Sequence, residues 1–253
     1  MKGITPCRVK SHADLSREWD QLAEERHRQI ACGEDLSFEH VVVPTTWRLF
    51  EGADLAIVLD IGSGTGDFTV RLARVAGKVI AVEPSRASVA LARRVCCATQ
   101  NVRFVEASLE EASSSVDERP ATAAVAVMTL MTAPDLRAFA RALAALLQAR
   151  GRFVATLAHP WFWPKYWGYE DEPWFHYDVE TFIEAPFVIS RRRTSVRTTH
   201  VHRPLCQYVS VFAEEGFRLD AIAEPMPPAE VQCLYPAPWR FPRFLGLRWE
   251  KAV

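Results

Sequence analysis

A glycine-rich segment at residues 58–67, Val-Leu-Asp-Ile-Gly-Ser-Gly-Thr-Gly-Asp, carries the strongest chemical signal in the chain. Gly62, Gly64 and Gly66 follow an apolar run, where a turn between a strand and a helix would bring bare backbone against a ligand. The spacing is G-x-G-x-G, whereas dinucleotide-binding loops have G-x-G-x-x-G. Asp60 precedes the loop and would repel a pyrophosphate. The segment therefore favours a cationic, phosphate-free cofactor over a nicotinamide or a flavin.

A second acidic residue, Glu83, follows the next apolar run, 79–82. It comes roughly 20 residues after Asp60, which is the spacing at which an acidic side chain meets ribose hydroxyls in dinucleotide-binding folds. A carboxylate can accept two hydrogen bonds from a vicinal diol. The alternative interpretation is structural, with Asp60 capping a helix and Glu83 solvated at a strand end.

Histidines near residues 159–203 are candidates for proton transfer, because a neutral imidazole is a usual base near pH 7. His159 directly follows a predicted strand, and His202 opens the sequence His-Arg-Pro-Leu. We therefore assign His159 and His202 as the candidate catalytic residues. His200 would share a strand face with His202 and support it. The alternative for each histidine is a structural role.

The same region is rich in aromatic residues, which can line an apolar substrate pocket and exclude water. The alternative is that these rings pack the region against the rest of the protein. A run of three arginines at 191–193 is interpreted as the solvated edge of a hairpin, with an anion clamp as the alternative. The candidate substrate residues are Trp161, Phe162, Trp163, Tyr166, Trp174 and Tyr177.

The elements that would position these side chains alternate between strands and helices. Apolar runs predict strands at 57–61, 79–82, 102–105, 123–128 and 153–157, and helical periodicity predicts helices at 67–75, 85–97 and 136–147. This alternation predicts an α/β, Rossmann-like, doubly wound sheet that is mostly parallel. Strands predicted at 217–223 and 244–249 would add an antiparallel C-terminal hairpin.

Four regions follow from this pattern. Residues 1–50 form an N-terminal helical cap with helices at 15–31 and 41–50, and residues 51–158 form the cofactor-binding core. Residues 159–203 form an aromatic-rich cap insertion made of a loop and a hairpin, and residues 204–253 complete the core sheet. Because ligands bind beyond the carboxyl ends of parallel strands, Met128 and the residues after it should face the cofactor.

Composition narrows the function classes. The chain has 253 residues, with 30 Lys and Arg against 31 Asp and Glu, so it lacks the basic surface that nucleic acid requires. No apolar stretch reaches the roughly 18 residues of a membrane span, and the first 20 residues lack the apolar centre of a secretory signal. The six cysteines form no C-x-x-C pair, which argues against a metal site or disulfides. We expect a cytoplasmic monomer or homodimer without a membrane or nucleic-acid partner.

Two motifs, Leu59-Asp-Ile-Gly-Ser-Gly-Thr-Gly and Val79-Ile-Ala-Val-Glu-Pro-Ser, resemble the first two motifs of class I S-adenosylmethionine-dependent methyltransferases. The resemblance implies S-adenosylmethionine as cofactor and S-adenosylhomocysteine as product. It implies that the glycine loop holds the methionine portion, that the acid after the second strand holds the ribose, and that residues after the third strand bracket the adenine. The residues implied to bind the cofactor are Phe38, His40, Asp60, Gly62, Ser63, Gly64, Gly66, Glu83, Pro84, Ser108, Leu109 and Met128.

The chain departs from the family pattern at three of these positions. Ser108 stands where the family often has Asp, and Phe38 and His40 stand where many relatives have Tyr and Arg. A serine can still exchange one hydrogen bond with adenine.

The predicted reaction is an in-line displacement that moves a methyl group to a small molecule, with a hydroxyl of a secondary metabolite as the first candidate. An amine or a carboxylate is the alternative acceptor. A member of the same fold that binds the cofactor without methylating, or that acts as a cyclase, is the alternative function. The loop spacing disfavours a nicotinamide-dependent oxidoreductase.

Overall fold

A seven-stranded mixed sheet forms the centre of the protein, in a computed structural model that describes residues 3–115, 120–189 and 193–253. The strand order is β4-β3-β2-β5-β6-β10-β9, and β10 alone runs antiparallel to its neighbours β6 and β9. The strands are β2 (Ile57–Ile61), β3 (Lys78–Val82), β4 (Val102–Val105), β5 (Ala121–Val127), β6 (Leu147–Ala158), β9 (Phe217–Ala223) and β10 (Phe244–Lys251). The predicted Rossmann-like sheet with an antiparallel C-terminal strand is confirmed.

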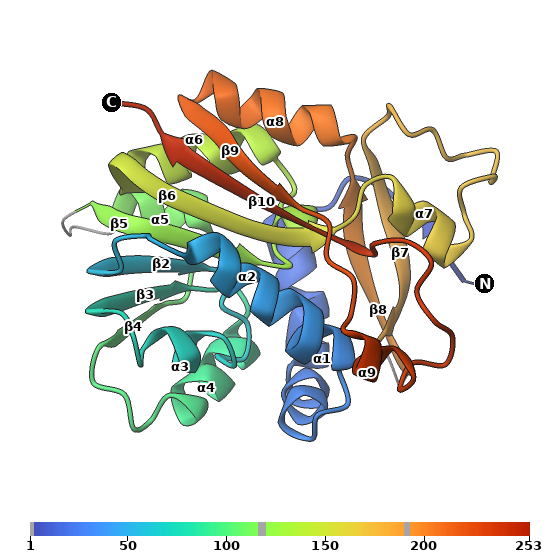
Figure 1. Cartoon of the computed structure of the whole chain (residues 1–253), viewed down its shortest axis with the longest axis horizontal. Helices are drawn as coiled ribbons and strands as arrows, with labels where there is room; N and C mark the ends of the chain where they lie inside the picture. The colour runs from blue at the N-terminus through green and yellow to red at the C-terminus, as the bar shows by residue number, and fades with distance from the viewer. Residues whose placement is uncertain (1–2, 116–119, 190–192) are drawn as a thin grey trace.

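Helices cover both faces of this sheet (Figure 1). Residues of α2 (Val43–Phe50) and α3 (Thr69–Leu72) join the buried cluster on one face. Residues of α5 (Leu109–Ser115), α6 (Leu136–Leu146) and α8 (Leu205–Glu214) join the cluster on the other. The chain changes direction across the sheet between β2 and β5, so a crevice is expected where their carboxyl ends diverge.

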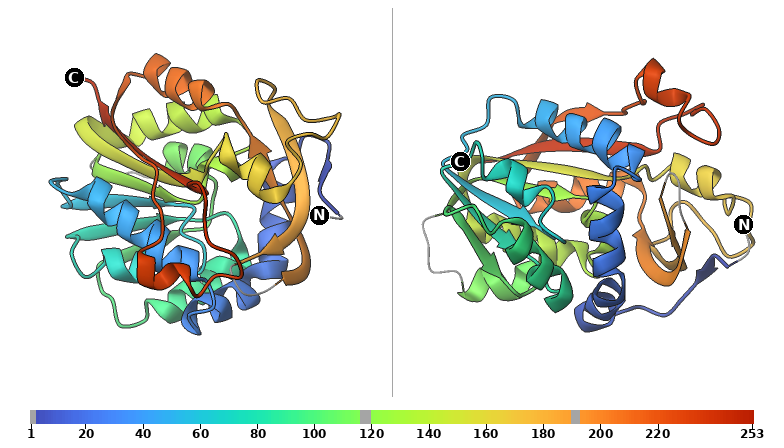
Figure 2. Two further views of the ribbon diagram at one scale, coloured as in Figure 1. Left: turned by 45° about the vertical axis from the view of Figure 1, so that its right-hand side comes forward. Right: turned by 90° about the horizontal axis from the view of Figure 1, so that it is seen from below.

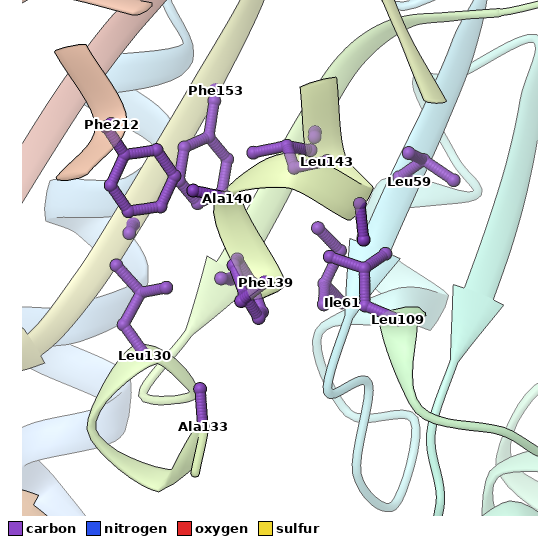
Figure 3. Packing of buried hydrophobic residues seen from close by; sticks show 14 of the residues in the cluster. Leu59, Ile61, Leu109, Leu130, Ala133, Phe139, Ala140, Leu143, Phe153 and Phe212 are labelled. Carbon is purple, nitrogen blue, oxygen red and sulfur yellow. The ribbon is translucent and has the colours of Figure 1, made fainter. Parts of the chain in front are cut away.

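Aliphatic and aromatic side chains fill the core between the sheet and the helices α5, α6 and α8, and Figure 3 shows Phe153 beside Phe212. The ring of Phe153 on β6 lies 5.4 Å from Phe212 on α8 and 5.2 Å from Trp249 on β10, with interplanar angles of 25° and 17°. Burying each such ring contributes roughly 1.5–3 kcal/mol to folding. This packing fixes the sheet, and with it the strand ends that carry the loops of interest.

A second, three-stranded antiparallel sheet stands beyond the carboxyl ends of the parallel strands (Figures 1 and 2). It contains β1 (Thr5–Pro6), β7 (Thr181–Val188) and β8 (Arg193–His202). The hairpin of β7 and β8 was predicted, whereas the pairing of β1 with β7 and the helix α7 (Phe162–Trp167) were not.

Helix α1 (His12–Ala31) lies between the core and the second sheet, with contacts to β8 and to α4 (Arg86–Val95). Short segments complete the fold: the π-helix η1 (Phe38–Val42), the 3-10 helix η2 (Leu130–Thr132) and α9 (Ala229–Gln232). Within the described ranges, no helix is long and apolar enough to cross a membrane.

Candidate active site

The loops after β2, β3, β4 and β5 surround one cavity together with α1, and we call it the glycine-loop cavity. It contains every predicted cofactor residue except His40 and Gly66. Its lining includes Leu15, Trp19, Ala23, Arg26, Ile30, Phe38, Asp60, Gly62, Ser63, Gly64, Glu83, Pro84, Ser108, Leu109, Met128 and Thr129.

Glycine is needed in the loop because the backbones approach closely. Gly62 has φ +66°, and a Cβ atom there would lie 2.4 Å from Oγ1 of Thr129, which follows β5. A Cβ atom on Gly66 would lie 2.9 Å from the Cα atom of Ala92 on α4. Gly66 therefore serves helix packing, while Gly62 allows the loops after β2 and β5 to meet.

Two features of the loop suit a ligand. Gly64 has φ +54°, and a Cβ atom added there would find only one neighbouring atom, 4.0 Å away, so the space beside its Cα atom is open. The hydroxyl of Ser63 is buried and has no hydrogen-bond partner in the part of the chain that the structure describes. A buried polar group normally has a partner, so this hydroxyl fits a ligand that supplies one.

Two buried carboxylates lie beside the loop. The Oε2 atom of Glu83 accepts a hydrogen bond from the N–H of Gly64 (2.9 Å), and its Oε1 atom accepts one from the N–H of Ser85 (2.8 Å). Asp60 accepts a hydrogen bond from the Thr69 hydroxyl (2.6 Å). Burial raises the pKa of Glu83 to about 7 and the pKa of Asp60 to about 6. A positively charged ligand would favour the ionised form of both groups.

Ser108 begins α5 through a capping box. Its N–H donates to Oε2 of Glu111 (2.9 Å), and its hydroxyl accepts from the N–H of Glu111 (3.2 Å). The Ser108 side chain is thus engaged in capping α5. It also holds Leu109, which is 3% exposed, as an apolar wall of the glycine-loop cavity.

Met128 lies directly after β5 with φ +57°, a left-handed backbone conformation that is unusual for a residue with a side chain. Its N–H donates to the Thr156 carbonyl on β6 (2.7 Å), which holds the strained turn in place. Such strain is concentrated at functional sites. The turn places Met128 in the walls of two cavities.

The second cavity lies between α1, α7, β7, β8 and the start of β10, and we call it the cap cavity. Trp163 and Tyr166 of α7, two of the predicted substrate residues, line it. Residues common to both cavities are Trp19, Arg26, Phe38, Met128 and Thr132. The two cavities therefore adjoin along this shared wall.

The other predicted substrate residues line neither cavity. Trp161 is 60% exposed and lies edge-on to Tyr177, with 5.0 Å between ring centroids. Phe162 stacks on Phe241 at 5.2 Å, and Trp174 packs among neighbouring rings of the cap. Substrate contacts of these four rings stay predictions.

The two predicted catalytic histidines also lie outside both cavities. Nε2 of His159 is 2.9 Å from Oε1 of Glu224, and Nε2 of His202 is 2.9 Å from the carbonyl oxygen of Tyr177. Burial lowers the pKa of each imidazole. Their catalytic role stays a prediction. In the structure, each imidazole lies within hydrogen-bond distance of another protein group.

His200, expected only to support His202, does line the cap cavity. Its Nε2 atom is 3.2 Å from the hydroxyl of Tyr169. Burial lowers the pKa of His200 to about 3, so the imidazole is neutral near pH 7.

Phe38 lines both cavities, with the guanidinium of Arg26 5.5 Å from its ring centroid. His40 lies two residues further along η1 and lines neither cavity, so its contact with the cofactor stays a prediction. In the arginine run 191–193, the first two residues lie outside the described ranges, and Arg193 begins β8.

Sequence reasoning missed several cavity residues. Trp19 could have been found, because it belongs to the predicted amphipathic helix 15–31, whose apolar face must pack against another part of the protein. Thr129 was not missed, because it is among the residues after Met128 that were expected to face the cofactor. Arg26 and Arg243 carry no local signal, because a single charged residue is usually solvated.

Residues 58–151 match the model of a family described as methyltransferase domain. This segment of the chain therefore carries a methyltransferase domain. The predicted enzyme class, an S-adenosylmethionine-dependent methyltransferase, is thereby confirmed, and so is the cofactor, S-adenosylmethionine with S-adenosylhomocysteine as product.

Solved structures share the fold of this methyltransferase at low sequence identity. A putative S-adenosylmethionine-dependent methyltransferase from Listeria monocytogenes is 20% identical, with a TM-score of 0.62 over 83% of this chain and 100% of that one. The DhpI–SAH complex is 19% identical, with a TM-score of 0.63 over 96% and 99%. A 1,6-didemethyltoxoflavin-N1-methyltransferase from Burkholderia thailandensis is 17% identical, with a TM-score of 0.59 over 99% and 95%. No curated protein sequence matches the chain.

Proposed function

We propose that this methyltransferase transfers a methyl group by in-line displacement to a small molecule held in the cap cavity. The observation that carries the proposal is the wall that the cap cavity shares with the glycine-loop cavity, at Phe38, Met128 and Thr132 among others. An acceptor in the cap cavity would be next to a cofactor in the glycine-loop cavity. The Burkholderia enzyme, solved with 1,6-didemethyltoxoflavin bound, supports a small-molecule acceptor by analogy of fold.

The residues present fit the cofactor. The methionine portion would lie against the glycine loop, with the Ser63 hydroxyl and the open space beside the Cα atom of Gly64 available to it and Asp60 near its ammonium group. Glu83 would accept hydrogen bonds from the ribose diol, and Leu109 would form a wall for the adenine. The bound cofactor supplies a methyl group activated by its positively charged sulfur.

The chain itself would contribute orientation and water exclusion. Holding two reactants in a productive geometry supplies a large part of the acceleration in such displacements. Trp163 and Tyr166 on one side and Phe38 on the other are apolar surfaces suited to keep the acceptor in place and dry.

We propose a hydroxyl oxygen as the acceptor atom. His200 lines the cap cavity and is neutral near pH 7, and with a pKa of about 3 it is a weak base. It can take the proton only as methyl transfer turns the hydroxyl into a strongly acidic oxonium. His159 and His202 are the alternatives, although they line neither cavity. An amine or a carboxylate acceptor would need no base.

The decisive experiment incubates the purified protein with S-adenosylmethionine and a panel of hydroxylated, amino and carboxyl compounds. A mass gain of one methylene on an acceptor, with equal formation of S-adenosylhomocysteine, supports methyl transfer. Stability of the product to mild alkali separates an ether or an amine from a carboxyl ester. If the cofactor binds but no acceptor gains mass, the non-methylating or cyclase-type alternative replaces the proposal.

The role of His200 gives a separate prediction. His200→Gln should lower kcat by roughly 10²-fold, the lower end of the range for general acid–base catalysis, because a base of low pKa removes a proton from the acceptor less effectively. His159→Gln and His202→Gln should retain turnover once differences in stability are taken into account. Because His200 is already deprotonated above about pH 3, the wild-type rate should show no limb near pH 6.5. A limb there that disappears in His159→Gln or His202→Gln would assign the base to that residue instead.

A further inference from the structure

Arg243, the residue directly before β10, lines the cap cavity, and its guanidinium lies over the ring of Tyr166, another residue of the same wall. The group lies 3.9 Å from the ring centroid of Tyr166 and 4.4 Å from that of Trp239. Its backbone carbonyl accepts a hydrogen bond from the N–H of His159 (2.9 Å), which fixes the position of the residue. Across the described ranges, no carboxylate lies within ion-pair distance of this guanidinium.

The remaining charges of the cap cavity cancel one another. Arg26 pairs with Asp35 at 2.7 Å, and the low pKa of His200 makes it neutral. Among the described residues that line the cavity, Arg243 therefore leaves one positive charge in excess. The cavity as a whole is lined mainly by apolar and aromatic side chains, where a charge is felt strongly.

Stacked aromatic rings only partly replace the water that Arg243 loses. Removing a cation from water is costly unless an opposite charge or hydrogen-bond acceptors compensate it, and a cation–π contact recovers a small part of that cost. Burial lowers the pKa of Arg243 in the free protein, the direction expected for a cation without an anionic partner. The five N–H donors of a guanidinium form a planar fork that matches a carboxylate or a phosphate.

We propose that the methyl acceptor carries an anionic group, a carboxylate or a phosphate-type oxyanion, which Arg243 binds. The inference rests on the proposed function, because it takes the cap cavity as the acceptor site. The anion serves as an anchor, and another atom of the same molecule receives the methyl group, since an oxyanion held by a guanidinium is a weakened nucleophile. Arg243 would thus select acidic acceptors from neutral molecules of the same shape.

The test measures binding, so it does not depend on turnover. The full chain, loaded with S-adenosylhomocysteine, is titrated in a calorimeter with 4-hydroxybenzoate, phenyl phosphate and the neutral 4-hydroxybenzamide. At least one anion should bind roughly 10–150-fold more tightly than the amide, the range for hydrogen bonds to a charged group. The better of the two anions identifies the carboxylate or the phosphate class.

Variants assign this preference to the guanidinium. Arg243→Gln should abolish the preference, Arg243→Lys should retain part of it, and Arg240→Gln, an exposed arginine of the same loop, should leave it unchanged. Unchanged affinity for S-adenosylhomocysteine and an unchanged Tm would show that each variant is folded. Equal binding of the amide and the anions, no binding of either anion, or a preference that survives Arg243→Gln would overturn the proposal. Failure of the acceptor screen with a positive result here would remove the proposed function and keep the anion site.

Discussion

The carboxylates of Asp60 and Glu83 are held inside the protein in a partly uncharged state, because burial raises the pKa of Asp60 to about 6 and that of Glu83 to about 7. A carboxyl group whose pKa is raised by folding binds more protons in the folded than in the unfolded state. Its contribution to stability is therefore present at low pH and is lost as pH rises from about 4 to about 7. Without the cofactor, these two buried carboxyl groups therefore lower the stability of the folded protein at neutral pH.

A cationic cofactor should reverse the effect, so its affinity should depend on pH. We expect S-adenosylmethionine to bind more tightly as pH rises from 5 to 8 and then to reach a plateau. Asp60 must lose its proton to pair with the ammonium group, and Glu83 must lose its proton to accept two hydrogen bonds from the ribose diol. Proton release on binding, measured by calorimetry in buffers of different ionisation enthalpy, checks this. No proton release at pH 6 would contradict it.

Glu83→Gln tests which carboxylate is responsible. The variant should weaken cofactor binding by about 1.5–3 kcal/mol, the value for hydrogen bonds to a charged group, and should flatten the pH dependence near pH 7. Glu106→Gln, at an exposed acidic residue after β4, serves as the matched control and should bind like the wild type. Equal affinity in the two variants would place the ribose contact elsewhere.

At the scale of elements, Arg203 joins the cap to the core. It directly follows β8, its side chain is 0% exposed, and it pairs with Glu180 at 2.6 Å. Its guanidinium also donates to the carbonyl oxygens of Leu130 (3.3 Å) and Ala133 (2.8 Å), at and just after η2. One side chain therefore satisfies the carbonyls at the end of a helix that adjoins both cavities.

Arg203→Met should lower the free energy of unfolding by about 2–4 kcal/mol, because it leaves buried carbonyls without donors and a partly exposed Glu180 without its partner. Urea unfolding monitored by circular dichroism measures the loss. Arg218→Met is the control, since Arg218 is 71% exposed and should change stability little. Similar losses in the two variants would show that the pair of Arg203 and Glu180 stabilises the protein no more than an exposed arginine does.

The regular elements of the core could be predicted from the sequence, because apolar runs bounded by glycines and charged residues have few other interpretations. The strands Ile57–Ile61, Val102–Val105 and Phe217–Ala223 begin and end where they were predicted. The strand β6 was predicted too short, because its first residues include Arg150 and Gly151, which carry no strand signal.

Missed elements have weak or contradictory local signals. Helix α5 is rich in serine and glutamate, and the sequence feature that indicates a helix there is the capping box of Ser108 and Glu111. Helix α7 contains Pro164, which normally argues against a helix, but the proline lies in the first turn, where its missing N–H is not needed. The pairing of Thr5 with Glu184 joins residues too far apart in sequence for a local pattern to reveal.

The residues of the candidate site also fall into those that the sequence predicts and those that it does not. Residues on the loops after strands could be predicted, because the fold itself places them together. His200 could not be separated from His202 by sequence, since both share one face of β8, and only the packing of the cap decides which of them reaches a cavity.

At the scale of the whole molecule, α1 connects the methyltransferase core with the cap. Asp20 accepts a hydrogen bond from the Ser85 hydroxyl of the core (2.7 Å), and Glu18 accepts one from the N–H of Thr199 of the cap (2.7 Å). The same helix supplies Trp19 and Arg26 to both cavities. A ligand that fills the glycine-loop cavity must therefore stabilise α1 against opening.

We expect saturating S-adenosylhomocysteine to slow amide hydrogen exchange in residues 15–30 by roughly tenfold or more, because a ligand that binds only the closed state suppresses opening by mass action. Exchange in α8, which lines neither cavity, is the internal reference and should change less. Equal protection of α1 and α8 would mean that the two helices open together, which would contradict a separate opening of α1.

The place of β10 in the sheet has a consequence for biosynthesis. β9 hydrogen-bonds to the rest of the sheet only through β10, although β10 follows it in the chain. While the ribosome is still making residues 224–243, β6 has an unpaired edge and β9 has no neighbour. The sheet is completed only when the later strand inserts between two earlier ones, and Arg243 arrives with that strand. Arg243 and Phe244 of the cap cavity are therefore synthesised after every described residue that lines the glycine-loop cavity, the last of which is Phe139.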